Sequence, residues 1–301
     1  MNSSASSVTP KIEILYPTDW VDYELLDSGD GQKLERYGPY RFVRPAPQAI
    51  WKPILDDKIW LSSHGIFQPT KQESGGVWKF NQPLKENPWL MTYKQLQFQA
   101  FTGGSRHMGV FPEQAVHWDW IQSLIQQSDK PPQVLNLFGY TGLATLAAAK
   151  AGAQVTHVDA SKKSIAQART NQALSGLETR PIRWIVDDAI KFLRREMRRG
   201  HRYEGIILDP PKFGRGPKGE VWEFFELFAA LLNDCIEILS SRPLFIVVTA
   251  YAIQASSLSL YYVLNQATQK IGGEISIGEL ALKEKSGGRL LSMAIYARWK
   301  S

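Results

Sequence analysis

Cysteine and histidine, the residues that most often hold transition metals, are sparse in this sequence. The 301 residues include one cysteine, Cys235, so a disulfide within the chain and a cysteine-built metal cage are both excluded. The five histidines are scattered and show no spacing typical of metal ligands, so we predict no metal site. A single thiol is typical of reducing compartments, and we expect a cytoplasmic protein.

Long apolar runs are missing as well. No stretch approaches the roughly 20 consecutive apolar residues that a membrane-spanning helix needs. The N-terminal segment MNSSASSVTP also lacks the apolar centre of a secretory signal. We therefore predict no membrane association, and we expect residues 1–15 to form a disordered tail.

Acidic residues are outnumbered by basic ones, and the net charge is +6. The basic residues gather in two segments, KFLRREMRRGHR at residues 191–202 and PKFGRGPK at residues 211–218. A basic surface attracts a polyanion such as nucleic acid. A solvated helix face has the same composition, so a nucleic-acid partner needs support from other residues.

The composition changes about one third of the way along the chain. The first part is rich in Trp, Pro and Gly with short alternating apolar runs, which predict a small antiparallel β domain over residues 16–110. From residue 111 to 301, strand-like and helix-like segments alternate, which predicts a mostly parallel sheet covered by helices on both faces.

Seven strands are predicted in this second part. The last two are separated only by KEKSGGR, so we expect them to pair as an antiparallel hairpin at one sheet edge. The sequence thus predicts a Rossmann-like α/β fold with a seven-stranded, mostly parallel sheet and a terminal antiparallel hairpin, preceded by the β domain. The predicted strands are residues 133–138, 154–160, 182–186, 203–209, 243–250, 274–282 and 290–299.

The glycine pattern of nicotinamide enzymes, G-x-G-x-x-G, is incomplete. In VLNLFGYTGLATLAAAK a buried strand turns through Gly139 and Gly142 into an alanine-rich helix, and the third glycine is absent. Asp159 ends the next strand, where a carboxylate can accept hydrogen bonds from the ribose of an adenosine. A pyrophosphate needs the close backbone approach that the third glycine would allow. S-adenosylmethionine has an adenosine without phosphate, so this methyl donor is favoured. The glycines would also suit a plain strand-to-helix turn.

The third predicted strand ends in VDDAIKF. There Asp188 is placed to accept a hydrogen bond from the exocyclic amine of adenine, and Ile190 to lie against the ring. Asp187 is the alternative, because strand ends are uncertain by a few residues. Either aspartate can instead cap the helix that follows, and Asp188 can serve both roles.

In this order and spacing, LNLFGYTG, VDAS, DDAIKFL and DPPKF resemble class I S-adenosylmethionine-dependent methyltransferases, specifically the bacterial 23S ribosomal RNA methyltransferase I and K group. The resemblance spans about residues 96–301 and includes GVFPEQAVHW before the cofactor loop. It implies which residues surround each part of the donor. The methionine end would meet Asn136, Phe138, Gly139, Tyr140 and Thr141, the ribose Asp159 and Ser161, and the adenine Asp188, while Phe111 and Gln114 would close over the donor.

The segment DPPKFGR would form the methyl-transfer site by the same resemblance, with Asp209, Pro210 and Pro211 lining it. The prolines lack N–H groups, so they end the strand ladder, and the Asp209 carboxylate and the Pro210 carbonyl can both accept from an amine and orient its lone pair. The alternative is that Asp209, Pro210 and Pro211 only end the strand and have no role in catalysis.

Beyond the prolines, Phe213 can stack on a base, although N-methylating enzymes have their ring one residue earlier, at Lys212 of this chain. Lys212 and Arg215 can bind a backbone phosphate instead. In the alternative interpretation of this segment, Phe213 is a core residue.

The sequence departs from the group in two places. By the same resemblance, members that methylate cytosine carbon 5 have a cysteine after the strand that follows Asp209. Here VVTAYA places Ala250 at that position. Carbon 5 needs covalent activation by a thiolate, and Cys235 lies in an amphipathic segment where it is more simply a core residue. The RNA-binding module typical of the group is not recognisable in residues 1–95.

These features predict an S-adenosylmethionine-dependent methyltransferase that acts on a base nitrogen of RNA, with ribosomal RNA implied by the resemblance, by direct in-line transfer. Two alternatives remain open. One is a methyltransferase for a small molecule or a protein, because the net charge is modest. The other is a non-catalytic RNA-binding protein that retains the donor pocket, although such a protein would not need Asp209, Pro210 and Pro211.

Overall fold

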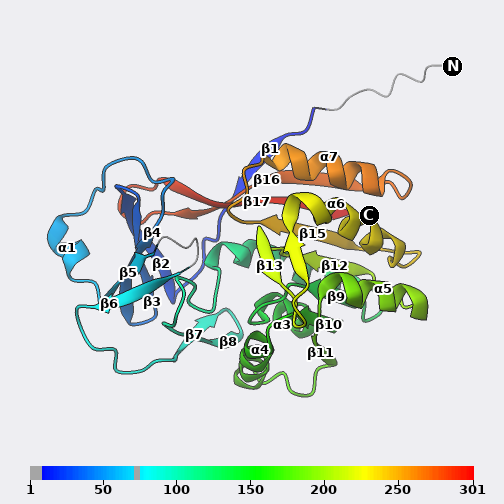
Figure 1. The fold of residues 1–301 in the computed structure, drawn as a ribbon, viewed down its shortest axis with the longest axis horizontal. Helices are drawn as coiled ribbons and strands as arrows, with labels where there is room; N and C mark the ends of the chain where they lie inside the picture. Colours follow the sequence, from blue (N-terminus) through cyan, green and yellow to red (C-terminus); the bar gives the residue numbers. More distant parts are fainter. Residues whose placement is uncertain (1–8, 71–74) are drawn as a thin grey trace.

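A central sheet of eight strands organises the computed structural model, which describes residues 9–70 and 75–301 (Figure 1). The strand order is β1-β16-β17-β15-β12-β9-β10-β11, and β17 alone runs antiparallel to its neighbours. The strands are β1 (Ile12–Leu15), β9 (Gln133–Leu137), β10 (Gln154–Asp159), β11 (Ile182–Val186), β12 (Gly205–Leu208), β15 (Phe245–Ala250), β16 (Glu274–Lys283) and β17 (Leu290–Lys300).

Helices cover both faces of this sheet, as the alternation of segments predicts. Leu135 and Leu137 face one core cluster and Val134 faces another, because successive side chains of a strand point to opposite faces. One face carries α2 (Ala115–Gln126), α3 (Leu143–Lys150) and α4 (Lys162–Leu174), and the other carries α5 (Ala189–Arg199), α6 (Phe224–Glu237) and α7 (Ser257–Thr268). The predicted Rossmann-like α/β architecture is confirmed.

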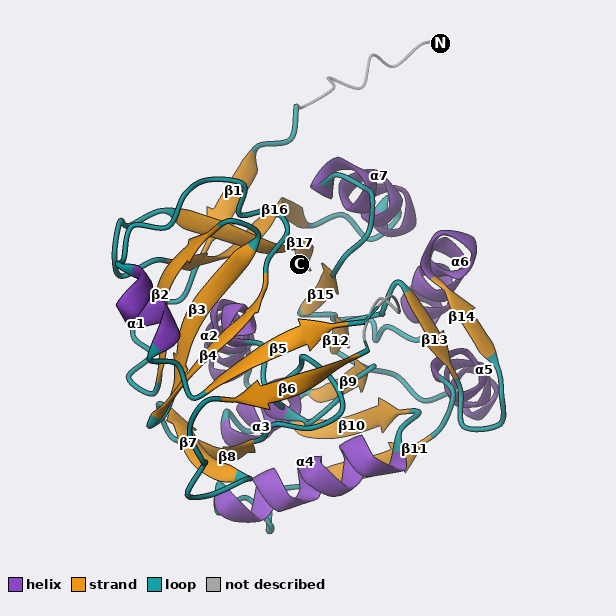
Figure 2. Ribbon diagram, turned by 60° about the vertical axis from the view of Figure 1, so that its left-hand side comes forward, coloured by secondary structure: helices purple, strands orange, loops and turns teal. Residues whose placement is uncertain are grey.

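The eighth strand, β1, corrects two expectations. It pairs in parallel with β16 from Ile12 to Leu15, so these residues are not a tail, and the hairpin of β16 and β17 is not the sheet edge (Figure 2). Gly278 allows this approach, since a Cβ there would lie 1.7 Å from the Glu13 carbonyl oxygen. Of the rest of the predicted tail, residues 9–11 have no regular structure and residues 1–8 lie outside the described residues.

The N-terminal part is β-rich, as predicted. A five-stranded sheet has the order β2-β3-β4-β5-β6, in which only β4 and β5 pair in parallel, and a separate hairpin joins β7 to β8. A short helix, α1 (Asp57–Leu61), precedes β5. The strands are β2 (Tyr23–Gly29), β3 (Gln32–Tyr37), β4 (Tyr40–Pro45), β5 (Gly65–Pro69), β6 (Gly76–Phe80), β7 (Trp89–Tyr93) and β8 (Leu96–Ala100).

One hydrophobic core runs across the predicted boundary at residue 110. It joins Tyr37 and Phe98 of the β domain to Trp118 of α2 and Leu146 of α3. The loop between β16 and β17 also enters the β domain, where Arg289 pairs with the buried Asp27. The division at residue 110 stays a prediction, but the two parts share one hydrophobic core.

Candidate functional site

A pocket opens at the carboxyl ends of β9 and β12, where ligands bind in sheets of this type. Residues from four separate stretches of the sequence meet there, including eight of those predicted to contact the donor or the acceptor. The predicted residues that line the pocket are Phe111, Gln114, Asn136, Phe138, Gly139, Tyr140, Thr141 and Asp209.

The loop after β9 has an unusual backbone. Phe138 (φ 58°), Tyr140 (φ 49°) and Gly142 (φ 86°) all adopt the left-handed conformation, which is uncommon for residues other than glycine. Two hydrogen bonds hold the loop: Tyr140 N–H donates to Asp159 Oδ2 at 2.8 Å, and the Thr141 hydroxyl donates to the Gly109 carbonyl at 2.6 Å. Backbone strain that is fixed in this way is concentrated at ligand sites.

The two glycines of the loop each have a packing reason. A Cβ on Gly139 would lie 2.3 Å from the His157 ring, which is buried beneath the loop. Gly142 combines its positive φ with close contact to Ala168 of α4. Their predicted role of admitting the donor remains a prediction, because the strand-to-helix turn needs both glycines in any case.

Asp159 and Ser161 lie one strand away from the pocket, at the end of β10. The Asp159 carboxylate accepts from the backbone N–H groups of Tyr140 and Ser161, both at 2.8 Å, and burial raises its pKa. The Ser161 hydroxyl caps α4 by accepting from Ser164 N–H. Asp159 therefore links the loop to the next strand, and its contact with the ribose stays a prediction.

The two aspartates after β11 have different partners. Asp187 pairs with Arg195 and accepts from the backbone N–H of Asp188. Asp188 caps α5 by accepting from Lys191 N–H at 2.9 Å. Both aspartates are thus engaged within the protein, and Ile190 packs against the core, so their contact with adenine stays a prediction.

Asp209 follows β12 and is the titratable group of the pocket. Gln114 donates to its Oδ2 at 3.1 Å. Burial first, and then the carboxylates of Glu113 and Asp159, raise the pKa of Asp209 from 3.8 to about 8. A carboxyl group that changes its ionisation near neutral pH is suited to accept a proton or a hydrogen bond from a substrate.

The prolines lead into a short hairpin that the sequence did not predict, β13 (Phe213–Arg215) and β14 (Val221–Glu223). Trp222 of β14 donates to the Pro211 carbonyl at 2.6 Å and packs with its ring centroid 5.0 Å from that of Phe138. Trp222 thus connects the Asp209 segment to the donor loop. With the Pro211 carbonyl occupied, the Pro210 carbonyl remains the predicted acceptor.

The outer face of this hairpin carries Phe213 and Arg215, both exposed, with Phe213 at 51% of its full accessible surface. The interpretation of Phe213 as a core residue is therefore wrong. Lys212 is also exposed and lies between Pro211 and the hairpin. None of these three side chains lines the pocket itself.

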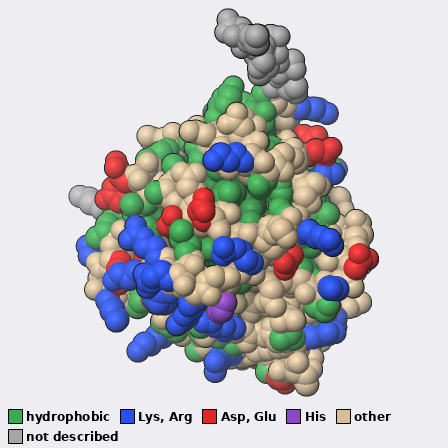
Figure 3. Space-filling view, turned by 90° about the vertical axis from the view of Figure 1, so that its right-hand side faces the viewer, with side chains coloured by type: hydrophobic (Ala, Val, Ile, Leu, Met, Phe, Trp, Pro, Cys, Tyr) green, Lys and Arg blue, Asp and Glu red, His purple; other side chains and the backbone are tan. Residues whose placement is uncertain are grey.

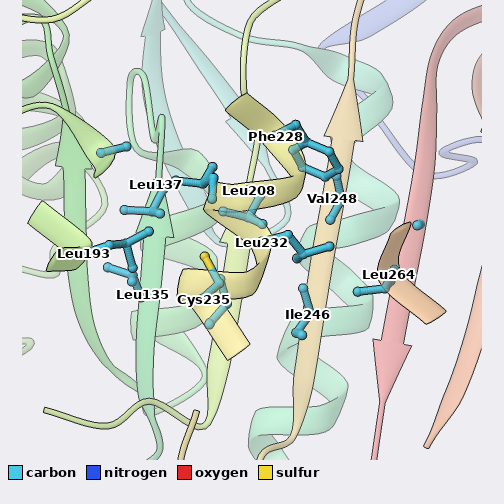
Figure 4. Packing of buried hydrophobic residues seen from close by; sticks show 14 of the residues in the cluster. Leu135, Leu137, Leu193, Leu208, Phe228, Leu232, Cys235, Ile246, Val248 and Leu264 are labelled. Carbon is cyan, nitrogen blue, oxygen red and sulfur yellow. The ribbon is translucent and has the colours of Figure 1, made fainter. Parts of the chain in front are cut away.

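No thiol lies near Asp209. Cys235 is fully buried in α6 among leucine and isoleucine side chains (Figure 4), and burial raises the pKa of its thiol. Ala250 occupies the end of β15, as the sequence indicates. The side chains around the pocket offer no covalent nucleophile for a ring carbon.

The basic residues of segment 191–202 do not adjoin the pocket. Helix α5 starts at the pocket edge of the sheet and ends at Gly200, where His201 N–H bonds back to the Glu196 carbonyl. Lys and Arg side chains gather over one side of the face in Figure 3, the end of the molecule where α5 terminates. Arg195 and Arg199 pair with Asp187 and Glu196. At the start of α5, Lys191 pairs with Glu220, which also accepts from Lys218 N–H, so segments 191–202 and 211–218 lie next to each other there.

Three residues around the site were not predicted. Glu113 is 1% exposed, and its Oε1 has no hydrogen-bond partner within residues 9–70 and 75–301. The hydroxyl of Tyr251, after β15, is likewise buried and unpaired in that part of the chain. Trp222 is the third. Only the fold brings Glu113 and Tyr251 together and Trp222 against Phe138, although Glu113 adjoins the predicted Gln114.

Membrane-spanning helices and metal clusters are both missing from the described residues. No helix among them has the length and apolar character needed to cross a membrane. Nor do three or more of their His, Cys, Asp and Glu side chains cluster in a way that could hold a metal ion.

Known proteins resemble this chain. The family model of S-adenosylmethionine-dependent methyltransferases matches residues 58–241. The ribosomal RNA large subunit methyltransferase K/L of Shewanella baltica is 28% identical over 213 residues, which cover 66% of this chain and 29% of that protein. The chain thus spans under a third of the length of the curated relatives it matches.

Solved structures agree over a longer span. The SAM-dependent methyltransferase from Agrobacterium tumefaciens is 45% identical, with a TM-score of 0.92 over 97% of this chain and 96% of its own. SMU.776, a methyltransferase in complex with S-adenosylhomocysteine, is 19% identical and shares the fold, with a TM-score of 0.72 over 92% of this chain and 75% of its own. The chain therefore belongs to the S-adenosylmethionine-dependent methyltransferases, and S-adenosylmethionine is its cofactor.

Proposed function

We propose that this protein transfers the methyl group of S-adenosylmethionine to a base nitrogen of RNA, and that the RNA is ribosomal. The observation that carries the proposal is the position of Asp209. Its carboxyl group lies in the same pocket as the donor loop, has a pKa near neutrality, and is followed by two prolines that leave a carbonyl for the acceptor.

The residues in and beside the pocket would hold the donor. Asn136, Phe138 and Gly139 would surround its methionine end with Tyr140, Thr141 and Gly142, and aromatic faces attract a sulfonium cation. Asp159 and Ser161 would hold the ribose, Asp188 and Ile190 the adenine, and Phe111 and Gln114 would close over the donor. S-adenosylmethionine supplies a methyl group activated by positively charged sulfur.

The chain's own residues then align the acceptor. The Asp209 carboxylate and the Pro210 carbonyl would accept hydrogen bonds from the amine, which directs its lone pair along the line of transfer. As the nitrogen–methyl bond forms and the sulfur–methyl bond breaks, Asp209 can take the proton that the nitrogen loses. A positive charge bound nearby favours the ionised carboxyl, so donor binding would lower the pKa of Asp209.

Residues outside the pocket would contact the rest of the RNA. The exposed Phe213 offers a ring on which an unstacked base can lie, and Lys212 and Arg215 can bind backbone phosphates. A base nitrogen is favoured over ring carbon 5 because Cys235 is enclosed in the core and Ala250 carries no thiol.

The test is incorporation of methyl groups from labelled donor into separated RNA, protein and small-molecule fractions of a lysate. We expect label in ribosomal RNA and, after digestion, in an N-methylated nucleoside. Label confined to protein or small molecules would support the alternative enzyme class, and RNA binding without incorporation would support a non-catalytic binder. The proposal also includes a cytoplasmic location, based on the single cysteine, which fractionation of cells would test.

A further inference from the structure

We propose that the acceptor nucleotide is held in a second cavity, between the β domain and the central sheet, where Glu113 and Tyr251 bind the N–H edge of its base. This inference rests on the proposed function and names the place where its substrate binds. The cavity has a volume of about 690 Å³, which is within the range of sites for small ligands.

The cavity adjoins the donor pocket. Val110 and Phe111 line both spaces, so they form the wall between them. Lys33 and Arg44 of the β domain and Tyr251 and Ile295 of the methyltransferase part line the remaining sides. The β domain therefore completes a site that the central sheet alone would leave open.

Two buried polar groups line this cavity next to each other. Glu113 Oε1 and the Tyr251 hydroxyl make no hydrogen bond of good geometry among residues 9–70 and 75–301, although they lie near enough to influence each other's pKa. A buried polar group without a partner costs about 1–3 kcal/mol, so such groups in folded proteins are commonly reserved for a ligand. A carboxyl group and a hydroxyl match a base edge that carries amine or amide N–H donors.

The polar wall borders the reacting carboxyl. Gln114, the next residue after Glu113, donates to Asp209 at 3.1 Å. The Glu113 carboxylate also contributes to the raised pKa of Asp209, which places the two carboxyl groups within electrostatic reach. A base bound by Glu113 would thus present its nitrogens toward Asp209 and the donor.

Aromatic rings gather around Phe111, at the wall between the two spaces. The Phe111 ring centroid lies 5.0 Å from that of Tyr251, 5.1 Å from His107 and 5.7 Å from Tyr140. Bases that leave their stack are commonly held against aromatic side chains. These rings would replace the stacking that the acceptor base loses.

Cationic side chains also line this cavity and can contact a phosphate. Lys33 and Arg44 share one acid, Glu35, with Nζ to Oε1 at 3.1 Å and Nε to Oε2 at 2.7 Å. Glu113 is a second acid that acts on Lys33, and Arg106 is a third cation, so the cations of this group outnumber its carboxyl groups. Phosphate contacts of this kind position a nucleotide, while the polar wall reads its base.

The experiment compares Glu113→Gln and Tyr251→Phe with the unmodified protein, and Glu178→Gln, an exposed carboxyl at another site, is the matched control. The substrate is an in vitro transcript of large-subunit ribosomal RNA, and S-adenosylhomocysteine affinity is measured by calorimetry. We expect both variants to lower kcat/KM for the transcript at least tenfold, while affinity for S-adenosylhomocysteine changes less than twofold and the control is unaffected. Arg106→Gln should raise KM for RNA three- to tenfold. This variant tests the cavity if the Glu113 variant does not fold.

The outcomes separate the two proposals. If the unmodified protein methylates the transcript but the variants stay within twofold of it in kcat/KM, the cavity is not the acceptor site, while the proposed function stands. An equal loss of S-adenosylhomocysteine affinity would also overturn the inference, because it would assign the residues to the donor pocket. If the unmodified protein methylates protein or small molecules and no RNA, the proposed function fails and this inference fails with it.

Discussion

At the scale of single residues, Asp209 lowers the stability of the folded protein but is needed for the proposed activity. Its carboxyl group is buried beside two other acids, and its pKa is about 8 in the folded protein against an ordinary value of 3.8. Between these values the folded protein holds a proton that the unfolded chain has released, so stability falls as pH rises from about 4 to about 8. A substitution that removes the ionisable carboxyl group should remove this loss of stability at high pH.

Asp209→Asn should therefore stabilise the protein while it slows catalysis. We expect the free energy of unfolding at pH 8 to rise by roughly 1–3 kcal/mol, with a smaller gain at pH 5, because the aspartic acid is already protonated there. Methyl transfer should fall roughly 10²-fold or more, since alignment of the nucleophile is lost. Denaturant titrations at both pH values check the first effect. A variant that is destabilised at pH 8 would contradict the described environment of Asp209.

Asp159 allows a matching test of the donor site. Asp159→Ala removes an acceptor from the Tyr140 and Ser161 N–H groups and from the predicted ribose contact. We expect binding of S-adenosylmethionine to weaken by roughly 1–3 kcal/mol. Calorimetry measures this, with Asp129→Ala, before the first strand of the donor site, as a control. Unchanged affinity would show that Asp159 does not contact the donor.

Cys235 distinguishes transfer to nitrogen from transfer to carbon. Cys235→Ala should keep turnover within a few-fold, because the thiol is enclosed in the core and is not a nucleophile. The cavity left behind should lower the free energy of unfolding by roughly 1 kcal/mol. Activity and thermal melting are measured on the same preparation. Loss of turnover in a folded variant that binds the donor would identify the thiol as the nucleophile and reject our assignment.

At the scale of elements, the hairpin of β13 and β14 is coupled to the donor loop through Trp222. Trp222→Phe removes the hydrogen bond to the Pro211 carbonyl but keeps a ring against Phe138. We expect a loss of about 1 kcal/mol in stability and a several-fold fall in kcat, because Asp209 is held less firmly. Trp78→Phe loses a similar bond, to the Ser105 carbonyl in the β domain, and should leave kcat unchanged. Equal effects on kcat would indicate a general loss of stability.

The elements also show what the sequence can predict. The strands of the central sheet from β9 onward were predictable because short apolar runs alternate with helical segments. Strand β1 has four residues, three of them exposed, so its pattern is too short, and its partner is 265 residues away at Ile277. Strands β13 and β14 have three residues each among glycines and prolines, a composition that indicates a loop.

The candidate site was predictable to the same extent. The loop of Gly139 and the segment of Asp209 are each one unbroken stretch of sequence. Their place at strand ends follows from the fold class. Glu113 and Tyr251 have no local signal, because their significance lies in being buried next to each other at one cavity. Such a property is created by tertiary packing and is not written in either segment.

At the scale of the whole molecule, the β domain and the methyltransferase part should not be separable. Removing residues 1–110 would expose Trp118, Leu143 and Leu146 of the shared core and leave Arg289 without Asp27. We expect residues 111–301 alone to be poorly soluble, or to melt well below the full chain, because this exposure creates an apolar patch. Calorimetric melting compares the two proteins. Equal melting temperatures would show that residues 111–301 are an independent domain.

The loop between β16 and β17 has a consequence for synthesis on the ribosome. Strand β1 finds its partner only at Ile277 to Leu280, and the buried Asp27 finds Ser286 and Arg289 later still. In a nascent chain the first strand is therefore unpaired, and the Asp27 carboxylate has donors from residues 54–60 but not its ion pair with Arg289, until almost all of the protein has been made. Contacts between such distant residues form slowly, so the chain completes its fold after translation rather than domain by domain during it.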